Sequence, residues 1–234
     1  MIDKSVQSCR EAVAQVFDGA SIMLGGFGNV GMPAQLIEAL REQGSRDLTL
    51  ISNGAGTGPY ALGALVGDGR VRKVIASFPA PSATEFRTRY LAGEIELELV
   101  PQGTLVERIR AGGCGLGGFY TPTAAGTDLA AGKETRVIDG QEYLLELPLK
   151  ADFAFLKAHW GDRLGNLMYR GTMRNFNTVM ATAANTVVAE VDRLVAVGEI
   201  LPDAVHTPGV FVDRLVCVER HPKVVELPRE ASAT

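Results

Sequence analysis

The sequence has little of what marks secreted, metal-binding or membrane proteins. Its 3 cysteines, Cys9, Cys114 and Cys217, are odd in number and far apart, which argues against a disulfide framework and a zinc cluster. No apolar run approaches the roughly 20 residues of a transmembrane helix. The opening residues mix charged and apolar side chains and lack the apolar core of a secretory signal. We therefore expect a cytoplasmic protein with no bound metal and no membrane contact.

Basic clusters and paired histidines are also missing. The formal net charge is −4 and no block of Lys and Arg occurs, so the chain has no electrostatic footprint for nucleic acid. The 3 histidines, His159, His206 and His221, lack acidic or cysteine neighbours at metal-ligand spacing and are expected to be structural. Arginines on helices are usually solvated. For that reason no site is assigned to Arg87, Arg89, Arg108, Arg110 and Arg136.

What is present is the composition of an ordinary globular protein. Hydrophobic residues make up 46% and charged residues 21% of the 234 residues, which fits neither a disordered chain nor a membrane protein. This length allows one large domain with a substantial core. We predict a single domain over residues 1–234.

Helices and strands alternate along the first half. Apolar residues at three- and four-residue spacing predict an amphipathic helix over residues 5–17. Short apolar runs predict buried strands, and strict alternation predicts a half-exposed strand whose glutamates face solvent. The buried strands are at 21–25, 48–52 and 71–78, and the half-exposed strand is at 95–100 with Glu94, Glu96 and Glu98 beside or within it.

Two helices are predicted from reciprocal capping pairs. Ser82 with Glu85, and Thr104 with Glu107, have the spacing at which a hydroxyl and a carboxylate satisfy each other's free backbone donors. The helices would begin at these hydroxyl residues.

The second half begins with a glycine- and threonine-rich stretch, residues 112–128, that has no periodicity. Loops of this length inside compact domains are usually functional. A hairpin follows, turning at Asp139-Gly140, because this dipeptide tolerates the positive φ values of a tight turn. Three more strands, ADFAFLKA, NTVVAEV and DRLVCVE, and a helix around FNTVMATAA complete the chain.

This order predicts an α/β fold: a mostly parallel open sheet with helices on both faces, plus a small antiparallel hairpin. Ligands in such folds bind beyond the carboxyl ends of the strands. The loops GGFGNVG, SNGAGTG and FPAPS each follow a predicted strand. We expect the three loops to meet at one edge of the sheet.

The loop GFGNVG, Gly26 to Gly31, matches the G-x-G-x-x-G pattern of dinucleotide-binding proteins. That pattern also requires an acidic residue about 20 positions further on, at the end of the next strand. Asn53 and Gly54 stand there instead. A nucleotide-binding module therefore stays an alternative with its main discriminator missing, and a sugar-phosphate isomerase or deaminase on a related sheet is a further alternative.

Six ordered blocks give a more specific signal. They are SIMLGGFGNVGMPAQLI, ISNGAG, LELVPQGTLVERIRAGG, GGFYTPTAAGT, KETRVIDGQEYLLE and HTPGVFVDRLV. Together they resemble the alpha (A) subunit of class I CoA-transferases over nearly the whole chain. Within that family, SFPAPS and GGFYTPTAAGT are most similar to members that act on 3-oxoadipate, and acetoacetate- or acetate-type members are also similar.

The resemblance implies a division of labour between two chains. A partner B subunit would carry a nucleophilic glutamate that forms a glutamyl-CoA thioester, and the glycine-rich block around that glutamate is not found in this sequence. The implied assembly is a heterodimer or an α2β2 heterotetramer. The implied reaction moves CoA from succinyl-CoA to a 3-oxo acid, with coenzyme A as substrate and no permanently bound cofactor.

The resemblance also implies site residues. Gln102 would be the oxyanion-stabilising catalytic amide, and Asn53 would contact substrate. A second asparagine often follows it in relatives, whereas this chain has Gly54, which leaves those contacts open. The substrate- or CoA-binding backbone would be Gly25, Gly26, Phe27 and Gly28. A loop amide closing a turn, for Gln102, and a tight turn without ligand, for the glycines, are the structural alternatives.

Overall fold

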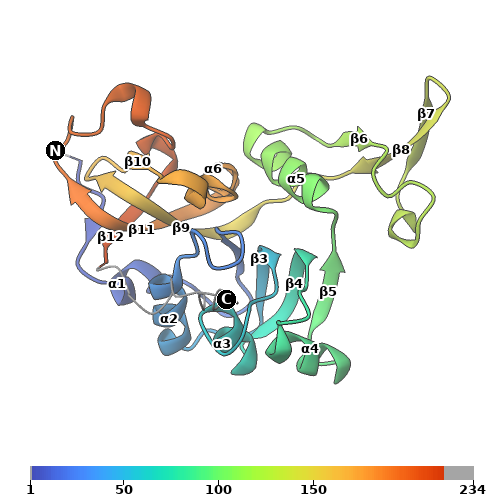
Figure 1. Ribbon diagram of the computed structural model, residues 1–234, viewed down its shortest axis with the longest axis horizontal. Coiled ribbons are helices and arrows are strands. Elements are labelled where there is room, and N and C mark those ends of the chain that lie inside the picture. Colours follow the sequence, from blue (N-terminus) through green and yellow to red (C-terminus); the bar gives the residue numbers. More distant parts are fainter. Residues whose placement is uncertain (1, 219–234) are drawn as a thin grey trace, which may run out of the picture.

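The computed structural model describes residues 2–218, and His221 and the end of the predicted DRLVCVE strand lie outside them. A nine-stranded sheet forms its centre (Figure 1). Eight strands are parallel, in the order β1-β12-β11-β9-β2-β3-β4-β5, and β10 pairs antiparallel with β9. The strands are β1 (Ser5–Val6), β2 (Ser21–Leu24), β3 (Leu48–Gly54), β4 (Val71–Phe78), β5 (Glu96–Leu99), β9 (Ala151–Asp162), β10 (Leu167–Met168), β11 (Ala184–Val195) and β12 (Arg214–Cys217).

Helices cover both faces of this sheet (Figure 1). One face carries α1 (Cys9–Val13), α2 (Ala34–Gln43), α3 (Leu62–Gly67) and α4 (Thr84–Leu91), and the other carries α5 (Gln102–Cys114) and α6 (Asn177–Met180). Short 3-10 turns are η1 (Asp128–Ala130), η2 (Gly171–Arg174), η3 (Pro202–Ala204) and η4 (Gly209–Phe211). The predicted fold class is confirmed.

Alternation along β2 shows why the sheet needs cover on both sides. Ile22 and Leu24 join the core under α1 to α4, whereas Met23 joins the core under α5 and α6. All three are buried. A strand whose successive side chains are apolar on both faces is typical of the interior of a parallel sheet.

The strand order reverses at β2, which lies between β3 and β9. A polar lock sets the register with β9: Asp152 Oδ2 accepts hydrogen bonds from Ser21 N at 2.8 Å and Ser21 Oγ at 2.6 Å, and Asp152 N donates to Ser21 Oγ at 2.9 Å. Open α/β sheets bind ligands at such a reversal, beyond the carboxyl ends of the strands.

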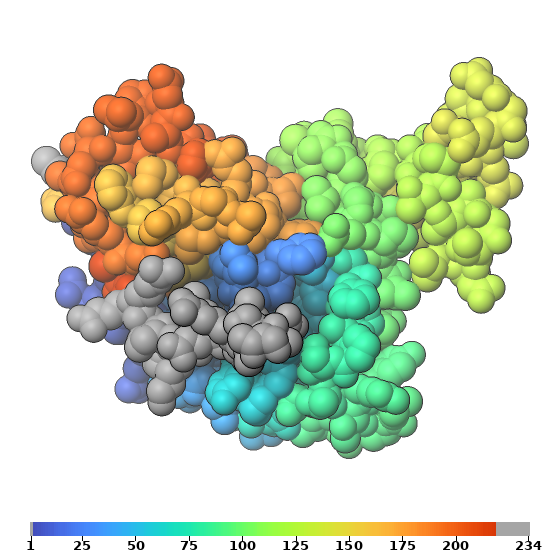
Figure 2. Space-filling model, viewed as in Figure 1, coloured from blue at the N-terminus to red at the C-terminus, as the bar shows by residue number. Residues whose placement is uncertain are grey.

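A three-stranded antiparallel sheet stands away from the main body (Figures 1 and 2). It consists of β6 (Phe119–Thr121), β7 (Thr135–Ile138) and β8 (Gln141–Glu146). Asp139 and Gly140 turn the β7–β8 hairpin with φ values of 49° and 78°, as the sequence predicts. Part of the stretch predicted to be an aperiodic loop is ordered here, because α5 continues to Cys114 and β6 follows.

The N-terminal helix prediction is only partly right. Ser5 and Val6 form β1, which pairs parallel with β12 from the other end of the described chain. The helix begins after Ser8, whose Oγ accepts a hydrogen bond from Glu11 N at 3.2 Å. It ends at Val13. Because the pairing with β12 is remote in sequence, helical periodicity gives no sign of it.

Both predicted capping pairs are wrong. Ala83 precedes α4 without a side-chain cap, and Glu85 accepts a hydrogen bond from Thr84 Oγ1 instead. The helix α5 begins two residues earlier than predicted, at Gln102, so Thr104 lies inside its first turn. Thr104 is buried there. A hydroxyl and a carboxylate at this spacing can also lie inside a helix, so the spacing alone does not locate the helix start.

Among residues 2–218, no helix has the length and apolar character needed to cross a membrane.

The packing of α5 against the segment that precedes β9 gives a test of the fold. Gly112 is buried in α5, and an added Cβ would overlap the backbone carbonyl oxygen of Leu149. We expect Gly112→Ala to destabilise the chain by about 1–3 kcal/mol, the usual cost of overpacking a core. Gly103→Ala, in the same helix but with open space around the added Cβ, is expected to be neutral or stabilising by up to about 1 kcal/mol. Urea unfolding of both variants checks this; equal effects would contradict the packing.

Candidate active site

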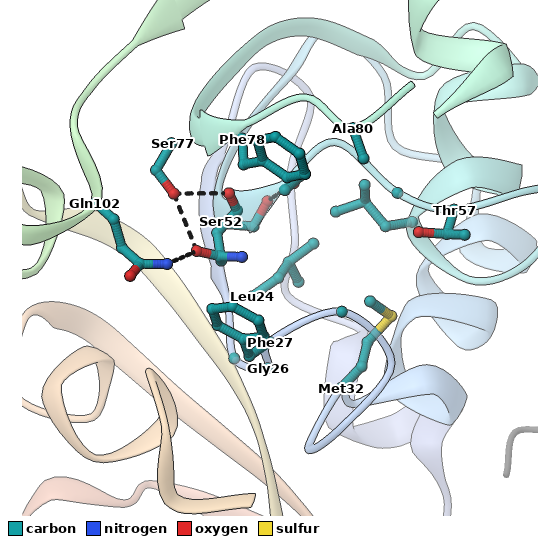
Figure 3. Close-up of a pocket in the computed structure, with 16 residues that line it drawn as sticks. Leu24, Gly26, Phe27, Met32, Ser52, Thr57, Ser77, Phe78, Ala80 and Gln102 are labelled. Atoms are coloured by element: carbon teal, nitrogen blue, oxygen red, sulfur yellow. Dashed lines mark hydrogen bonds between the residues drawn. The ribbon is translucent and has the colours of Figure 1, made fainter. Parts of the chain in front are cut away.

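A cavity of about 500 Å³ lies beyond the carboxyl ends of β2, β3 and β4 (Figure 3). All six residues that the sequence analysis singled out line it: Gly25, Gly26, Phe27, Gly28, Asn53 and Gln102. They come from the loop after β2, the end of β3 and the start of α5. Phe78 and Ala80, from the FPAPS segment, line the cavity too, so the three predicted loops do meet at this edge. The structure thus brings the expected residues together, and their roles stay predictions.

Two side-chain amides and a hydroxyl form the polar wall of this cavity. Gln102 Nε2 donates a hydrogen bond to Asn53 Oδ1 at 2.6 Å, and Ser77 Oγ donates to the same oxygen at 3.0 Å (Figure 3). Ser77 Oγ is also 3.0 Å from the backbone oxygen of Asn53. Asn53 is almost fully buried, whereas Gln102 is exposed. Ser77 was not among the residues expected at the site, although it lies near the end of a predicted strand.

These bonds fix which atoms of the amides face inward. Asn53 Oδ1 accepts hydrogen bonds from Gln102 and Ser77. Asn53 Nδ2 makes no hydrogen bond within residues 2–218, so its N–H groups are available to a ligand. Gln102 Nε2 uses one of its two N–H groups on Asn53. The wall therefore presents several neutral N–H donors to a ligand.

The N-terminus of α5 adds to this polar wall. Gln102 is the first residue of the 13-residue helix, Pro101 precedes it, and no side chain of the described residues caps it. An uncapped helix start exposes backbone N–H groups and carries the positive end of the helix dipole. Negative charge next to Gln102 is therefore favoured.

The start of α2, at the same edge, already has a carboxylate bound to its backbone amides. Glu190 Oε2, from β11, accepts hydrogen bonds from Gln35 N and Leu36 N in the first turn of α2, each at 2.9 Å. Glu190 is buried, and burial raises the pKa of its carboxyl, opposed by Lys157 and the two backbone amides. Lys157 Nζ lies 3.4 Å from Glu190 Oε1. No local sequence pattern pointed to this contact.

This contact argues against the dinucleotide-binding alternative for GFGNVG. A pyrophosphate in that motif binds the backbone N–H groups at the start of the following helix. In this chain Glu190 takes up those groups at Gln35 and Leu36. A carboxylate in the same place would also repel the phosphates.

The glycines of the loop have different reasons to be glycine. At Gly25 an added Cβ would overlap the side chain of Asn177, and Gly26 has a φ of 119° beside the backbone of Met32. Gly28, with a φ of 57°, has open space where a Cβ would be. Tight packing therefore accounts for Gly25, and backbone conformation for Gly26 and Gly28.

A second cavity of about 510 Å³ adjoins the first, and Phe27 and Gln102 line both. Its other walls are the first turns of α5 and the segment from Asn175 to Val179. Among the described residues lining the two cavities, Glu107 is the one with an ionisable side chain. The described stretch 112–128 contributes no residue to either cavity.

Glu98 does not belong to a solvated face, contrary to the prediction. Lys73 Nζ lies 2.7 Å from one carboxylate oxygen and Arg108 Nη1 lies 2.8 Å from the other, so Glu98 joins β5, β4 and α5. Burial opposes its ionisation, but these two cations outweigh burial and hold the pKa of Glu98 below its usual value. Arg108 is itself mostly buried and also donates to Leu147 O at 2.9 Å.

The two described histidines have protein partners. His159 Nδ1 lies 3.0 Å from Asp192 Oδ2, and His206 Nδ1 accepts a hydrogen bond from Tyr169 N at 2.9 Å. Both contacts agree with a structural role. Across the part of the chain that the structure describes, no group of three or more His, Cys, Asp or Glu residues is arranged to hold a metal ion.

The fold and the site together define a doubly wound α/β fold with a cavity at its topological reversal, lined among residues 2–218 by apolar, amide and hydroxyl groups. A coenzyme A transferase family model matches residues 6–218, and the chain belongs to this family.

Individual relatives agree with this assignment. The chain is 55% identical over 219 residues to the A subunit of the 3-oxoadipate CoA-transferase of Pseudomonas putida, covering 93% of this chain and 95% of that one. It is 51% identical over 201 residues to the A subunit of the succinyl-CoA:3-ketoacid coenzyme A transferase of Xanthomonas campestris, covering 86% and 83%.

A solved structure shares the fold. An acyl-CoA transferase of Escherichia coli O157:H7 superposes with a TM-score of 0.84 at 23% identity, covering 92% of this chain and 47% of that one. This chain thus spans about half the length of that enzyme.

The ion pairs of Glu98 give a pH prediction. An acid whose pKa is lowered on folding stabilises the fold above its unfolded pKa, near 4.5, and loses this contribution as pH falls through the lower folded value. We expect Glu98→Gln to lower Tm at pH 6 and to flatten the loss of Tm between about pH 5 and pH 3. Glu96→Gln is the control, because the ion pair of Glu96 among the described residues is a 4.0 Å surface contact with Arg72. Parallel Tm profiles for Glu98→Gln and the unmodified chain would contradict this assignment.

Proposed function

We propose that this chain is the A subunit of a CoA-transferase that moves CoA from succinyl-CoA to 3-oxoadipate, together with a partner B subunit that supplies a nucleophilic glutamate. Family membership supports the reaction class. The names of the relatives support the donor and acceptor, because one acts on 3-oxoadipate and another on succinyl-CoA and a 3-ketoacid.

One observation carries the division of labour. Of the 16 described residues that line the main cavity, several are amide or hydroxyl donors and none is an Asp or Glu. Moving CoA between two acids through a covalent enzyme intermediate requires a carboxylate at the reacting carbon. In this proposal the carboxylate reaches the cavity from the partner.

The relay runs in balanced steps. The partner's carboxylate attacks the thioester carbon of succinyl-CoA, giving a mixed anhydride and releasing CoA thiolate. The thiolate attacks the glutamyl carbonyl of the anhydride, which gives enzyme-bound glutamyl-CoA and releases succinate. The carboxylate of the 3-oxo acid then attacks the carbonyl carbon of glutamyl-CoA, giving a second mixed anhydride and releasing CoA thiolate. The thiolate attacks the 3-oxoacyl carbonyl of this anhydride, which gives the new acyl-CoA and regenerates the glutamate.

Each attack forms a tetrahedral oxyanion, and the polar wall of this chain is suited to stabilise it. Gln102 has a second N–H beyond the one given to Asn53, and it lies at the uncapped start of α5. Neutral donors held in advance at the place where charge develops lower the barrier. Asn53 both fixes Gln102 and offers its own Nδ2 group.

Apolar side chains at the mouth of the cavity fit both the acyl-CoA and the partner. Phe27 and Phe78 line the cavity and are 53% and 60% exposed. Large aromatic side chains are enriched where proteins associate. In this proposal they contact the pantetheine arm or the B subunit, and the glycine loop gives the acyl group its close approach to the backbone.

The choice of 3-oxo acid depends on a second carboxylate, which 3-oxoadipate has and acetoacetate lacks. The described residues lining both cavities include no Lys or Arg. In the proposed complex, the amides of Asn53 and Gln102, the start of α5, or a cation of the partner would bind that carboxylate. An acetate- or acetoacetate-type enzyme is the alternative.

The division of labour predicts where CoA becomes attached. We expect no transferase activity from this chain alone and full activity after mixing with its B subunit. After treatment with succinyl-CoA, peptide mass spectrometry should find the CoA adduct on a glutamate of the partner. Rates with 3-oxoadipate, acetoacetate and acetate as acceptors in the mixed enzyme decide between the two substrate types.

Two results would contradict the proposal. An adduct on any Asp or Glu of this chain would place the nucleophile here. Turnover of a sugar phosphate by the isolated chain, without CoA, would favour the isomerase or deaminase alternative.

The oxyanion role predicts a kinetic effect of Gln102. We expect Gln102→Ala to lower kcat of the mixed enzyme by roughly tenfold to a thousandfold, the range for losing one oxyanion donor. Gln141→Ala is the matched control, because Gln141 is an exposed residue of β8 that lines neither cavity. Steady-state rates of both variants are measured against the unmodified enzyme. An unchanged kcat for Gln102→Ala would remove Gln102 from the reaction.

A further inference from the structure

The segment Gly25–Gly31, called the glycine loop below, is held by side chains from the last third of the described chain. Asn175 and Asn177 contact the loop itself, and Glu190 contacts the start of the helix that follows it. These residues are far from the loop in sequence, and they belong to none of the glycine-rich segments expected to form the site.

Asn177 uses its whole side chain for this contact. Its Nδ2 donates to Gly31 O at 3.0 Å and to Met173 O at 2.8 Å, and its Oδ1 accepts from Lys157 N of β9 at 2.9 Å. Asn177 is fully buried. It therefore ties the loop to β9 and to η2 at once.

The shape of the loop depends on the same side chain. A Cβ at Gly25 would overlap Asn177 Oδ1, and a Cβ at Gly31 would lie 2.9 Å from Asn177 Nδ2 and from Met173 O. Both are below the distance that real Cβ contacts show. Gly25 and Gly31, the two ends of the loop, are thus shaped around Asn177.

Asn175 and Glu190 complete the hold on the loop. Asn175 Nδ2 donates to Val30 O at 3.0 Å, just inside the loop. Glu190 accepts from the first-turn amides of α2, and Lys157 pairs with both Glu190, at 3.4 Å, and Asp192, at 2.8 Å. The loop and the helix after it are therefore anchored to β9 and β11.

Phe27 gives this hold a functional consequence. It lies in the loop and lines both cavities together with Gln102. A tight backbone turn holds it: Phe27 N donates a hydrogen bond to Val30 O at 3.0 Å, and Val30 N donates to Phe27 O at 3.1 Å. A displacement of the loop would move Phe27 relative to Gln102. Small misplacements of groups that position substrate cost on the order of a hundredfold in rate.

We propose that Asn175, Asn177 and Glu190 are positioning residues that keep the glycine loop in the arrangement needed for catalysis. The loop is a wall built in advance rather than a lid that closes on substrate. The kinetic consequence rests on the proposed transferase function, whereas the hold on the loop does not depend on it.

The test compares three variants of the full chain, each mixed with the B subunit. Asn175→Ala removes one bond to the loop, and Asn177→Ala removes the central contact. Asn166→Ala is the matched control: Asn166 is also half-buried and also joins separate segments, through Asp162 and Gly209 N at 2.9 Å each, but lines neither cavity. Tm, kcat with succinyl-CoA and 3-oxoadipate, and amide hydrogen exchange of residues 25–31 are measured.

We expect Asn175→Ala and Asn166→Ala to lower Tm by similar amounts, because each deletes one bridging amide. Of these two variants, Asn175→Ala alone should speed exchange of residues 25–31 and lower kcat, by on the order of tenfold. Asn177→Ala should do both more strongly. If Asn177→Ala fails to fold, Asn175→Ala alone decides.

Unchanged exchange and unchanged kcat in Asn175→Ala would overturn the inference, as would equal losses of kcat in Asn175→Ala and Asn166→Ala. If the unmodified complex lacks transferase activity, the proposed function fails, and the exchange of residues 25–31 still decides whether these side chains hold the loop.

Discussion

The pairing of β2 with β9 is the constraint on which the site depends. It joins the strands of the first half of the chain to those of the second half, and the lock between Ser21 and Asp152 fixes its register. With this register, the glycine loop leaves β2 next to the point where β9 passes Asn177. The loops after β3 and β4 and the start of α5 reach the same edge, so one pairing determines what faces the cavity.

Among residues 2–218, carboxylates stabilise structure near the main cavity, and none of them lines it. Glu190 neutralises the start of α2, and Glu98 holds α5 to the sheet through Arg108. The start of α5 has no such partner among the residues described, and it carries Gln102. The start of α2 is thus neutralised, whereas the start of α5 has no carboxylate on it among the described residues. This contrast supports an anion-stabilising cavity that receives its nucleophile from another chain.

Local pattern was sufficient to predict most of the sheet. The buried strands at β3 and β4, the Asp139-Gly140 turn and the meeting of three loops follow from apolar runs and turn chemistry, which act over a few residues. Two of the failures depended on distant partners. β1 requires β12, and Glu98 is drawn in by Lys73 and Arg108.

The candidate site divides in the same way. Family resemblance pointed to Gln102 and Asn53, but neither resemblance nor spacing showed that they bond each other or that Ser77 fixes the amide. The glycines suggested ligand contact, whereas the structure shows that Gly25 makes room for Asn177. The sequence on either side of a glycine does not show which distant side chain packs against it, so such contacts are seen only in the folded structure.

The strand order also has a consequence for synthesis on the ribosome. β2 is made early, but its second neighbour, β9, emerges only after the projecting β6-β8-β7 sheet has been translated, and β1 waits for β12 until the described chain is almost complete. Until β9 is made, the apolar strand β2 has one unpaired edge, and such edges readily associate with other chains. In a nascent polypeptide with this topology, β2 can pair with β3 early, but its second edge stays exposed to aggregation until β9 has been translated.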